Sequence, residues 1–391
     1  MQNSEQTDER LHITNLRQLV TENNASERTI IWQTSEEQKF IVEYKKEQDF
    51  SSRTIPAQLH KLQSGTDTFY QYNALLTNLE PAAEYSYRIS DGKNSGSWHK
   101  ICTDKGKTLS ALIFPDSQSS DYNSWQNLAQ QAFKNNPSAD LYINMGDLVD
   151  NGADYHQWNE WFKGVKTFSV DIPLAPVMGN HETYTLDWKT QQPYFYTNLF
   201  ALPSNGYDNY QNHFYSFDYG PVHFIVLDTQ FDELKDFQPQ LLADQLAWLK
   251  QDLSSHTAPW TIVLQHKDIL LYELKNRPNT STHFIDIGKI FMPVFEEYNV
   301  DLVLTAHLHT YRRRVPLKNF QPDTEGITYI LTGIAGNIMY PGLWKESNLD
   351  AAAGPDGDTG NYLTLQADEN NLTVAAYTAD GKKFDEYVMK K

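Results

Sequence analysis

Five short segments of the sequence carry the side chains whose types and spacing could do chemistry. Each follows an apolar run or an extended segment. In chain order they are Phe114-Pro115-Asp116-Ser117-Gln118, Met145-Gly146-Asp147-Leu148-Val149-Asp150, Met178-Gly179-Asn180-His181-Glu182, Leu264-Gln265-His266 and Ala306-His307-Leu308-His309. Carboxylates, amide oxygens and imidazoles are ligands suited to Mn, Fe or Zn. Two such ions about 3.5–4 Å apart need one carboxylate that bridges them and separate ligands on each side.

Each of these segments is a weak signal when it is taken alone. A His-x-His pair is common by chance, Gly-Asp-x-x-Asp is commonly a turn, and Gly-Asn-His-Glu can be no more than a helix start. All five occur in one chain, each after a predicted strand. Open α/β sheets bind ligands at the carboxyl ends of their strands. The set therefore favours one shared metal site.

The elements that must position these residues fall into two regions. Up to about residue 105 the chain predicts short strands and polar turns, at the spacing typical of a β-sandwich. The strands are predicted at Thr29–Thr34, Phe40–Tyr44, Tyr70–Leu76 and Glu84–Ile89. Lys105-Gly106-Lys107 is the predicted junction. We therefore expect one domain over residues 1–106 and a second over residues 107–391.

The second region alternates strands with helices, which predicts βαβ units and a largely parallel sheet. The expected strands are Ala111–Phe114, Leu141–Met145, Trp260–Gln265 and Leu302–Thr305. The expected helices are Trp125–Phe133, Tyr155–Phe162, Leu242–Leu253 and Ile287–Tyr298. The tail, Asn361–Met389, returns to β-strands. The fold class is thus α/β behind an all-β domain.

Composition excludes several classes of function. The 391 residues include 50 acidic and 32 basic side chains, a formal net charge of −18. Such a surface does not attract a nucleic-acid duplex or an anionic membrane. The single cysteine, Cys102, rules out a disulfide framework and a thiolate zinc cluster. No segment approaches the ~18 apolar residues of a transmembrane helix.

Taken together, the motifs resemble those of calcineurin-like metallophosphoesterases of the purple acid phosphatase branch. The resemblance rests on Gly-Asn-His-Glu at 179–182, on His307-Leu308-His309-Thr310-Tyr311-Arg312, which is similar to the branch's GHxHxYxR, and on Tyr215–Gly220 with Trp248-Leu249. It covers nearly the whole chain. It implies a four-layer α/β/β/α sandwich preceded by a fibronectin type III-like β-sandwich.

The resemblance also implies the ligands of two metal ions. Asp147 would bridge them. Asp116 and His309 would bind the first ion, and Asn180, His266 and His307 the second. The ions would be divalent or mixed-valence transition metals, Fe, Mn or Zn. Two departures affect the first ion: Gln118 stands where other metallophosphoesterases have His, and Asp150 stands where the purple enzymes have Tyr.

These departures have consequences for the first metal ion. The Gln118 oxygen or a water molecule would take the vacant ligand position. An amide oxygen is a poorer ligand than imidazole or phenolate, so we expect the first ion to bind weakly. Without a phenolate ligand, the protein should not be purple even when it is loaded with ferric iron.

Five side chains are candidates for binding the substrate or for catalysis. His181, implied by the resemblance, would face the phosphate or the leaving group beside Asn180, and Asp150 would hydrogen-bond His181 and fix its tautomer. The alternative for Asp150 is a helix cap. His283 is a candidate second proton donor, with an ordinary exposed loop histidine as the alternative. Arg312 could contact phosphate, with a solvated basic face as the alternative.

The function expected from these residues is hydrolysis of a phosphoric ester by a metal-bound water, most simply of a phosphomonoester as in acid phosphatases. One alternative is a phosphodiesterase acting on cyclic nucleotides or glycerophosphodiesters. A second is a catalytically weak cell-surface binding protein in which the sandwich does the work. The polar N-terminal segment has no leader-like pattern. We expect a secreted or cell-surface protein whose leader is not in this sequence, with a cytoplasmic one as the alternative.

Overall fold

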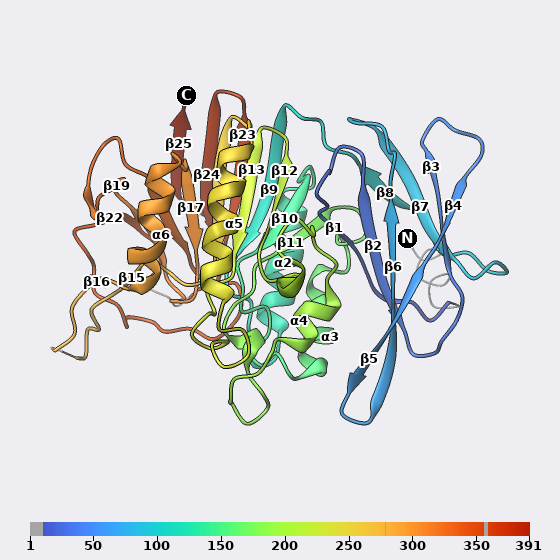
Figure 1. The fold of residues 1–391 in the computed structure, drawn as a ribbon, viewed down its shortest axis with the longest axis horizontal. Coiled ribbons are helices and arrows are strands. Elements are labelled where there is room, and N and C mark those ends of the chain that lie inside the picture. Colours follow the sequence, from blue (N-terminus) through green and yellow to red (C-terminus); the bar gives the residue numbers. More distant parts are fainter. Residues whose placement is uncertain (1–10, 278, 356–358) are drawn as a thin grey trace.

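The computed structural model describes residues 11–277, 279–355 and 359–391. Strands outnumber helices, and the helices lie on the outer faces (Figure 1). The predicted β-sandwich lies at one end, and the predicted α/β region occupies the rest. One hydrophobic core runs through the α/β region, and a smaller one, built around Trp32, Tyr72 and Tyr87, fills the sandwich.

The larger sheet has ten strands and crosses the predicted boundary between 106 and 107. In spatial order its strands are β25 (Lys383–Lys390), β24 (Asn371–Thr378), β23 (Asn361–Asp368), β9 (Thr108–Phe114), β10 (Leu141–Asn144), β11 (Pro173–Pro176), β1 (Thr14–Leu19), β2 (Arg28–Thr34), β6 (Asp67–Leu76) and β5 (Gln58–Ser64). Strands β9, β10 and β11 are parallel neighbours. The three C-terminal strands continue the sheet in antiparallel pairing, as the predicted β tail requires.

The second sheet has seven strands and belongs to the α/β region alone. Its order is β12 (Tyr215–Tyr219), β13 (Val222–Leu227), β14 (Trp260–Gln265), β17 (Leu302–Thr305), β21 (Thr328–Thr332), β18 (Tyr311–Arg314) and β22 (Asp350–Ala353). Strands β13, β14, β17 and β21 run parallel. They are almost continuously apolar and buried, because a parallel sheet is covered on both faces.

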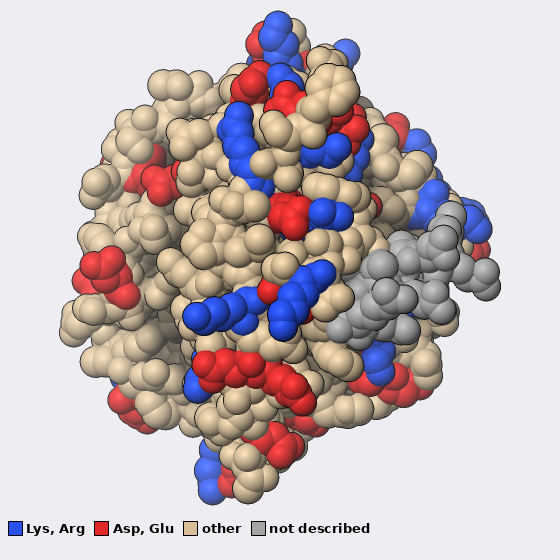
Figure 2. All heavy atoms as spheres, turned by 90° about the vertical axis from the view of Figure 1, so that its right-hand side faces the viewer, with Lys and Arg blue, Asp and Glu red and all other residues tan. Residues whose placement is uncertain are grey.

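The sandwich is linked to the α/β region by a strand pair that the sequence did not indicate. Strand β1 pairs in parallel with β11, with Leu19 opposite Leu174. The other sheet of the sandwich has four strands, β4 (Arg53–Pro56), β3 (Ile41–Lys46), β7 (Glu84–Ser90) and β8 (His99–Cys102). On the sandwich end of the molecule, basic and acidic side chains are interspersed (Figure 2). The described part of that face therefore presents no single-sign patch of the kind that attracts a polyanion.

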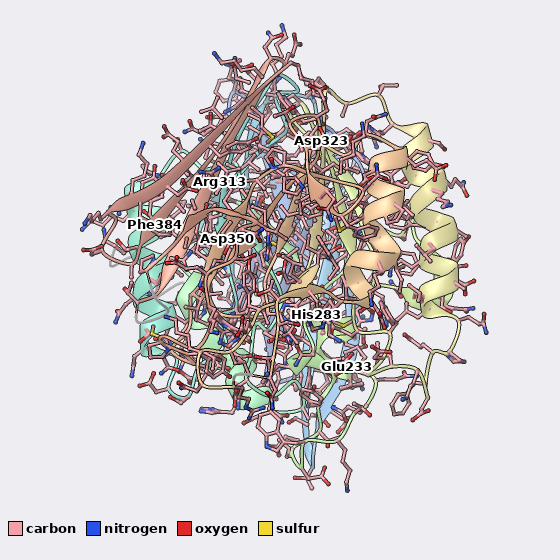
Figure 3. The ribbon with its side chains drawn as sticks, turned by 90° about the vertical axis from the view of Figure 1, so that its left-hand side faces the viewer. Glu233, His283, Arg313, Asp323, Asp350 and Phe384 are labelled. Carbon is pink, nitrogen blue, oxygen red and sulfur yellow. The ribbon has the colours of Figure 1, made fainter. Side chains whose placement is uncertain are left out.

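Helices cover the two sheets from outside, which gives the α/β/β/α layers that the resemblance implies. The helices are α2 (Asn123–Asn135), α3 (Tyr155–Val165), α4 (Tyr194–Leu199), α5 (Leu241–Ser255) and α6 (Asp286–Glu297), with short 3-10 turns at His181–Thr183 and Asp208–Tyr210. Helices α5 and α6 lie side by side on the seven-stranded side (Figures 1 and 3). All four predicted helices are confirmed to within a few residues.

The apolar spacing of α2 shows why it packs where it does. Trp125, Leu128, Ala129 and Ala132 are buried along one face, at the i, i+3, i+4 and i+7 spacing of an amphipathic helix. Trp125 meets Phe114 of β9 edge-on, with ring centroids 5.2 Å apart, and stacks on Trp161 of α3 at 5.6 Å. These contacts fix both helices against the strands that lead into the site.

Two small sheets complete the architecture: β15 (Leu270–Leu271) with β16 (His283–Phe284), and β19 (Leu317–Lys318) with β20 (Gln321–Pro322). Within the described ranges, no helix has the length and apolar character needed to cross a bilayer.

Candidate metal centre

The five chemistry-bearing segments meet where the carboxyl ends of the two sheets come together. Asp116, Asp147 and Asn180 follow β9, β10 and β11 of the larger sheet, and His266 and His307 follow β14 and β17 of the smaller one. The two edges are in direct contact. Nδ1 of His266 lies 2.9 Å from the carbonyl oxygen of Met145, and the backbone at Asp116 forms a bridge with Ile334 beyond β21.

Two glycines allow the close approach of these loops. Gly146 has φ of +99°, and a Cβ there would lie 2.5 Å from Nδ1 of His266. A Cβ on Gly179 would lie 2.2 Å from Oδ1 of Asp147. Both distances are far inside van der Waals contact. This steric demand explains why glycine precedes Asp147 and Asn180 in the two motifs.

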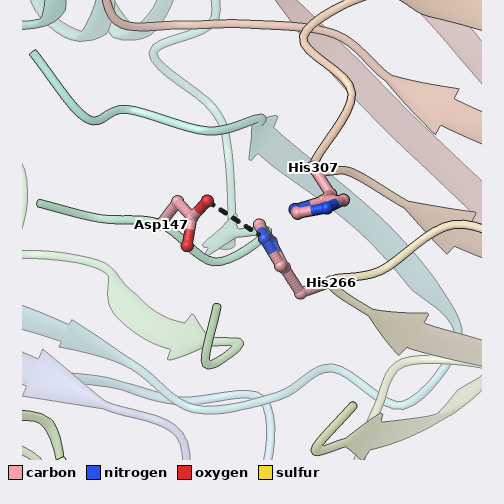
Figure 4. A group of neighbouring side chains, drawn as sticks. All are labelled: Asp147, His266 and His307. Carbon is pink, nitrogen blue, oxygen red and sulfur yellow. Dashed lines mark ion pairs between the residues drawn. The ribbon is translucent and has the colours of Figure 1, made fainter. Parts of the chain in front are cut away.

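Three side chains form the first group of candidate metal ligands. Asp147, His266 and His307 each offer a ligand atom within 4.8 Å of the others (Figure 4). Nε2 of His266 is 3.1 Å from Oδ2 of Asp147 and 3.2 Å from Oδ1 of Asn180. The Met145 carbonyl only accepts a hydrogen bond, so Nδ1 of His266 carries the proton. Nε2 faces the carboxylate and the amide oxygen, and a cation held between these groups would take its lone pair.

A second group shares Asp147 with the first. Asp116, Asp147 and His309 offer ligand atoms within 4.8 Å of one another, and all three are buried. Nε2 of His309 is 3.0 Å from Oδ2 of Asp116, and its Nδ1 faces the carbonyl oxygen of Ile338. The imidazoles of His266 and His309 are thus each oriented by a backbone carbonyl, as metal-ligating histidines usually are. These groups fit a pair of hard-to-borderline cations, because every donor is oxygen or nitrogen.

Gln118 lies beside the second group. Its backbone N–H donates to the carbonyl oxygen of Asp147 at 2.9 Å. Its side chain is buried, and Oε1 has no hydrogen-bond partner among the described residues. A buried amide oxygen without a partner is costly unless something else satisfies it. An electropositive ligand such as a cation would do so.

Opposite pKa shifts within the site follow from its burial and its charges. Burial alone would lower the pKa of His266, but the carboxylates of Asp147 and Asp116 raise it to about 9. Burial and the neighbouring His266 lower the pKa of His307 to about 3. Burial opposes ionisation of Asp147, yet the surrounding histidines hold its pKa well below its usual range. The site therefore keeps Asp147 charged and His307 neutral, as metal ligation requires.

Glu182 is a residue to which sequence analysis gave no role. Its buried carboxylate accepts backbone N–H groups from Gly179 at 2.7 Å, Leu148 at 2.9 Å and Asp147 at 3.0 Å. Burial and the nearby Asp147 raise the pKa of Glu182 to about 7. Its hydrogen bonds hold the two loops that present Asp147 and Asn180. Its place in Gly-Asn-His-Glu was the only signal in the sequence.

His181 and Asp150 are neighbours, but not in the predicted way. The Asp150 carboxylate is 3.8 Å from Nδ1 of His181, whereas the Asp150 backbone carbonyl lies 2.6 Å from that nitrogen. The expected side-chain hydrogen bond is therefore replaced by one to the main chain, because the turn after Asp147 brings the carbonyl closer. The alternative of a helix cap is also wrong, since Asp154 caps α3. Nε2 of His181 lies 4.0 Å from Oδ2 of Asp147.

The other two predicted contacts lie in different surroundings. Arg312 is buried and pairs with Asp350, with Nη1 3.4 Å from Oδ2. Arg313 pairs with Asp385, and Arg314 with Asp268. The interpretation of these arginines as a solvated basic face is therefore wrong, because each of them forms an ion pair with a carboxylate from a segment that is distant in the sequence. His283 is exposed on β16, with Nδ1 2.8 Å from the carbonyl oxygen of Ser281 (Figure 3). Roles for Arg312 and His283 toward the substrate stay predictions.

Solved structures share this fold. Purple acid phosphatase PPD1 from yellow lupin (Lupinus luteus) seeds superposes with a TM-score of 0.80 and 16% identity, covering 97% of this chain and 74% of that one. The structure of PhoD superposes with a TM-score of 0.67 and 14% identity, covering 96% of this chain and 90% of that one. At these identities the likeness shows the fold alone.

Curated relatives carry purple acid phosphatase names. Purple acid phosphatase 23 of Arabidopsis thaliana is 29% identical over 192 residues, which are 46% of this chain and 38% of the relative. "Probable inactive purple acid phosphatase 1" of the same plant is 24% identical over 382 residues, 83% of this chain and 58% of the relative. Acid phosphatase type 7 of Mus musculus is 24% identical over 297 residues, 68% and 64%. The chain thus matches only 38% and 58% of the length of the first two of these relatives.

Family models match most of the sequence. The purple acid phosphatase N-terminal domain matches residues 13–103. The calcineurin-like phosphoesterase family matches residues 99–311, more than half of the chain. The chain therefore belongs to the calcineurin-like phosphoesterase family, in its purple acid phosphatase branch.

Proposed function

We propose that this protein is a dinuclear metal-dependent phosphatase that hydrolyses phosphomonoesters. The observation that carries the proposal is the membership of Asp147 in both ligand groups. A carboxylate with that position can bridge two cations, which is the arrangement that two-metal phosphoester hydrolysis needs. The family to which the chain belongs is one of phosphoesterases, and it implies a dinuclear centre.

The ligand assignment follows from the two groups. Asp116 and His309 would hold one metal ion, Asn180, His266 and His307 the other, and Asp147 both. Gln118 would offer its unpartnered oxygen to the ion beside Asp116. We propose Fe, Mn or Zn, because imidazole and carboxylate donors suit these ions.

The chemistry divides between the metal ions and the side chains. When bound, the ions would supply a nucleophilic hydroxide near neutral pH and neutralise negative charge on the phosphate. His181 would act on the leaving group. Its Nδ1–H donates to the carbonyl of Asp150, so Nε2 faces the site.

His181 is suited to donate a proton there. Burial opposes the charged imidazole, but Asp147 and the Asp150 carbonyl outweigh it and raise the pKa of His181. A larger fraction of imidazolium is then present to protonate a departing alkoxide from Nε2. The backbone N–H of His181 donates to Oδ1 of Asp147 at 2.8 Å, which keeps the ring next to the proposed bridging carboxylate.

The experiment measures phosphate release from an aryl phosphate by protein reconstituted with Mn, Fe or Zn. We expect turnover that is lost on chelation and in Asp147→Asn and His307→Ala. The control, His60→Ala, changes an exposed histidine of β5 and should leave turnover unchanged. Equal rates in wild type and both site variants would contradict the proposal. An aryl phosphodiester assayed in parallel separates the diesterase alternative.

One observation favours a second candidate, a catalytically weak binding protein. Gln118 leaves one ligand group short of a charged or imidazole donor, and three of the relatives are named "probable inactive" purple acid phosphatases 1, 27 and 24. Metal content separates the candidates. About two ions per chain support the enzyme, and none supports the binding protein.

A further inference from the structure

A rigid hairpin beside His181 carries an aromatic side chain to which the proposed chemistry gives no role. Tyr184 and Thr190 form an antiparallel bridge, and Trp188 lies at the turn between them. The Trp188 ring meets the His181 ring edge-on, with centroids 5.8 Å apart, and lies 6.0 Å from the Tyr184 ring. The side chain is still 55% exposed. One part of this indole therefore faces His181, and the rest faces open solvent.

The backbone of Trp188 is held in an unfavourable conformation. Its φ is +61°, in the left-handed region that bulky side chains rarely adopt. Strain of this kind persists where surrounding contacts impose it, and it clusters at binding and catalytic sites. The exposed ring does not fill a core that would explain the strain.

Several hydrogen bonds impose this conformation. The Thr185 N–H donates to the Lys189 carbonyl at 2.7 Å, and the Trp188 N–H donates to the Thr185 carbonyl at 2.9 Å. Nδ2 of Asn151, in the loop after Asp147, donates to the same Thr185 carbonyl at 2.8 Å. The hairpin is thus fastened to the loop of the proposed bridging carboxylate. Trp188 is presented in a fixed place rather than on a loose segment.

A second exposed ring borders the other ligand group. Tyr340 stacks on the His309 ring, with centroids 4.9 Å apart and planes 15° apart, and is 43% exposed. Its loop is tied to the His307–His309 segment, because Nε1 of Trp344 donates to the carbonyl of Leu308 at 2.9 Å. The exposed part of the Tyr340 ring therefore lies beside the ligand group that contains His309.

We propose, on the basis of the phosphatase function above, that Trp188 and Tyr340 form an aromatic rim selecting esters whose leaving group carries a planar aromatic ring. His181 is the residue expected to face the leaving group, and Trp188 is the exposed ring packed against it. Aromatic side chains stack on the faces of planar rings, and this stacking strengthens binding. A preorganised platform keeps that gain, since little ordering is needed on binding.

The test measures binding, so it does not depend on turnover. Calorimetry on the manganese-loaded protein compares phenylphosphonate with methylphosphonate, which bind through the same headgroup but cannot be hydrolysed. The wild type should prefer the phenyl compound by about tenfold or more. Trp188→Leu should lower that preference by about tenfold, and Tyr340→Leu should lower it by a smaller factor.

A matched control uses a distant exposed tryptophan. Trp98 of the sandwich is 41% exposed and lies over Arg88. Trp98→Leu should leave the preference unchanged. The phosphonate analogue of adenosine monophosphate, run in parallel, shows whether the rim also takes a ring joined through a ribose.

The outcomes separate this inference from the proposed function. Equal affinity of the wild type for phenyl- and methylphosphonate would overturn the rim, as would a preference that survives in both rim variants. Neither result would affect phosphate release from simple esters. Failure of the metal-loaded protein to hydrolyse any ester would overturn the phosphatase but not the phenyl preference.

Discussion

The two halves of the candidate metal centre share Asp147 but differ in their other donors. One half has Asn180, His266 and His307 around the shared carboxylate. The other has Asp116 and His309, and beyond them the unpartnered amide oxygen of Gln118. One imidazole of each half, that of His266 or of His309, is oriented by a backbone carbonyl, from Met145 or Ile338 respectively. The halves are therefore equally well supported and differ in donor strength, which predicts two unequal metal affinities.

The largest expected effect comes from removing the element that the halves share. Asp147→Asn takes the charge from both halves while keeping the shape of the side chain. We expect metal content to fall from about two ions per chain to well below one. We expect turnover to fall by more than about 10³-fold, beyond the loss for a single transition-state hydrogen-bond donor. Elemental analysis and phosphate release measure the two effects. Retention of both ions would show that Asp147 does not bridge.

Substitutions confined to one half should remove one ion each. His307→Ala should abolish binding in the half that contains His266, and His309→Ala should abolish it in the half that contains Asp116. In each variant we expect about one ion per chain. The ion that remains in His307→Ala should bind more weakly than the ion that remains in His309→Ala. The reason is that His307→Ala keeps the half with Gln118. Titration with Mn²⁺ measures both affinities. Equal Mn²⁺ affinities in the two variants would contradict the predicted difference between the two halves.

Glu182 supports both halves through the backbone, so its loss should weaken both. Glu182→Gln replaces an acceptor of four N–H groups with an amide that also donates. We expect metal affinity to fall about 10–100-fold in both halves, as is usual for residues that hold a ligand in place. Glu233→Gln, which breaks an ion pair with Lys267, serves as the control. A fall in only one half would contradict a shared supporting role.

The proposed difference in metal affinity rests on Gln118, and a better ligand there should reduce it. Gln118→His offers an imidazole in place of an amide. We expect the weaker affinity to rise by about tenfold, with the stronger one unchanged. Gln118→Ala should lower the weaker affinity further. If neither variant alters metal binding, Gln118 is not a ligand.

The smallest expected effect is the absence of a colour. Asp150 stands three residues after Asp147, where the purple enzymes have Tyr, so no phenolate is expected on the ion beside Asp116 and His309. The ferric protein should therefore lack an intense visible band. Tyr340 is the tyrosine stacked on His309, and it provides the contrary outcome. A band that appears with ferric iron and disappears in Tyr340→Phe would make Tyr340 a ligand.

Local sequence predicted the parts of the fold that depend on local interactions. The four helices and the strands before Asp116, Asp147, His266 and His307 were indicated by apolar periodicity, and the structure confirms them. The parallel pair between β1 and β11 was not indicated. Strand pairing between distant segments depends on which edges meet after folding, and no spacing in the chain encodes that.

The site shows the same division at single residues. Asp150 was expected to bond His181 through its carboxylate, and the turn places its carbonyl there instead. Successive residues on β18 point to opposite faces, yet Arg312, Arg313 and Arg314 all find carboxylates from remote segments. Trp188 and Tyr340 are 152 positions apart in the sequence. No pattern in the sequence indicated that both would lie beside the site.

By itself, the sequence determined which side chains could bind metal and which strands would carry them, because strand-end motifs are local and their residue types restrict the chemistry. Only the tertiary structure decided that Asp147 is within reach of two ligand groups, that the buried Gln118 oxygen has no hydrogen-bond partner among the described residues, and which exposed rings contact His181 and His309. These features depend on distances between chain segments that meet only when the two sheets pack together.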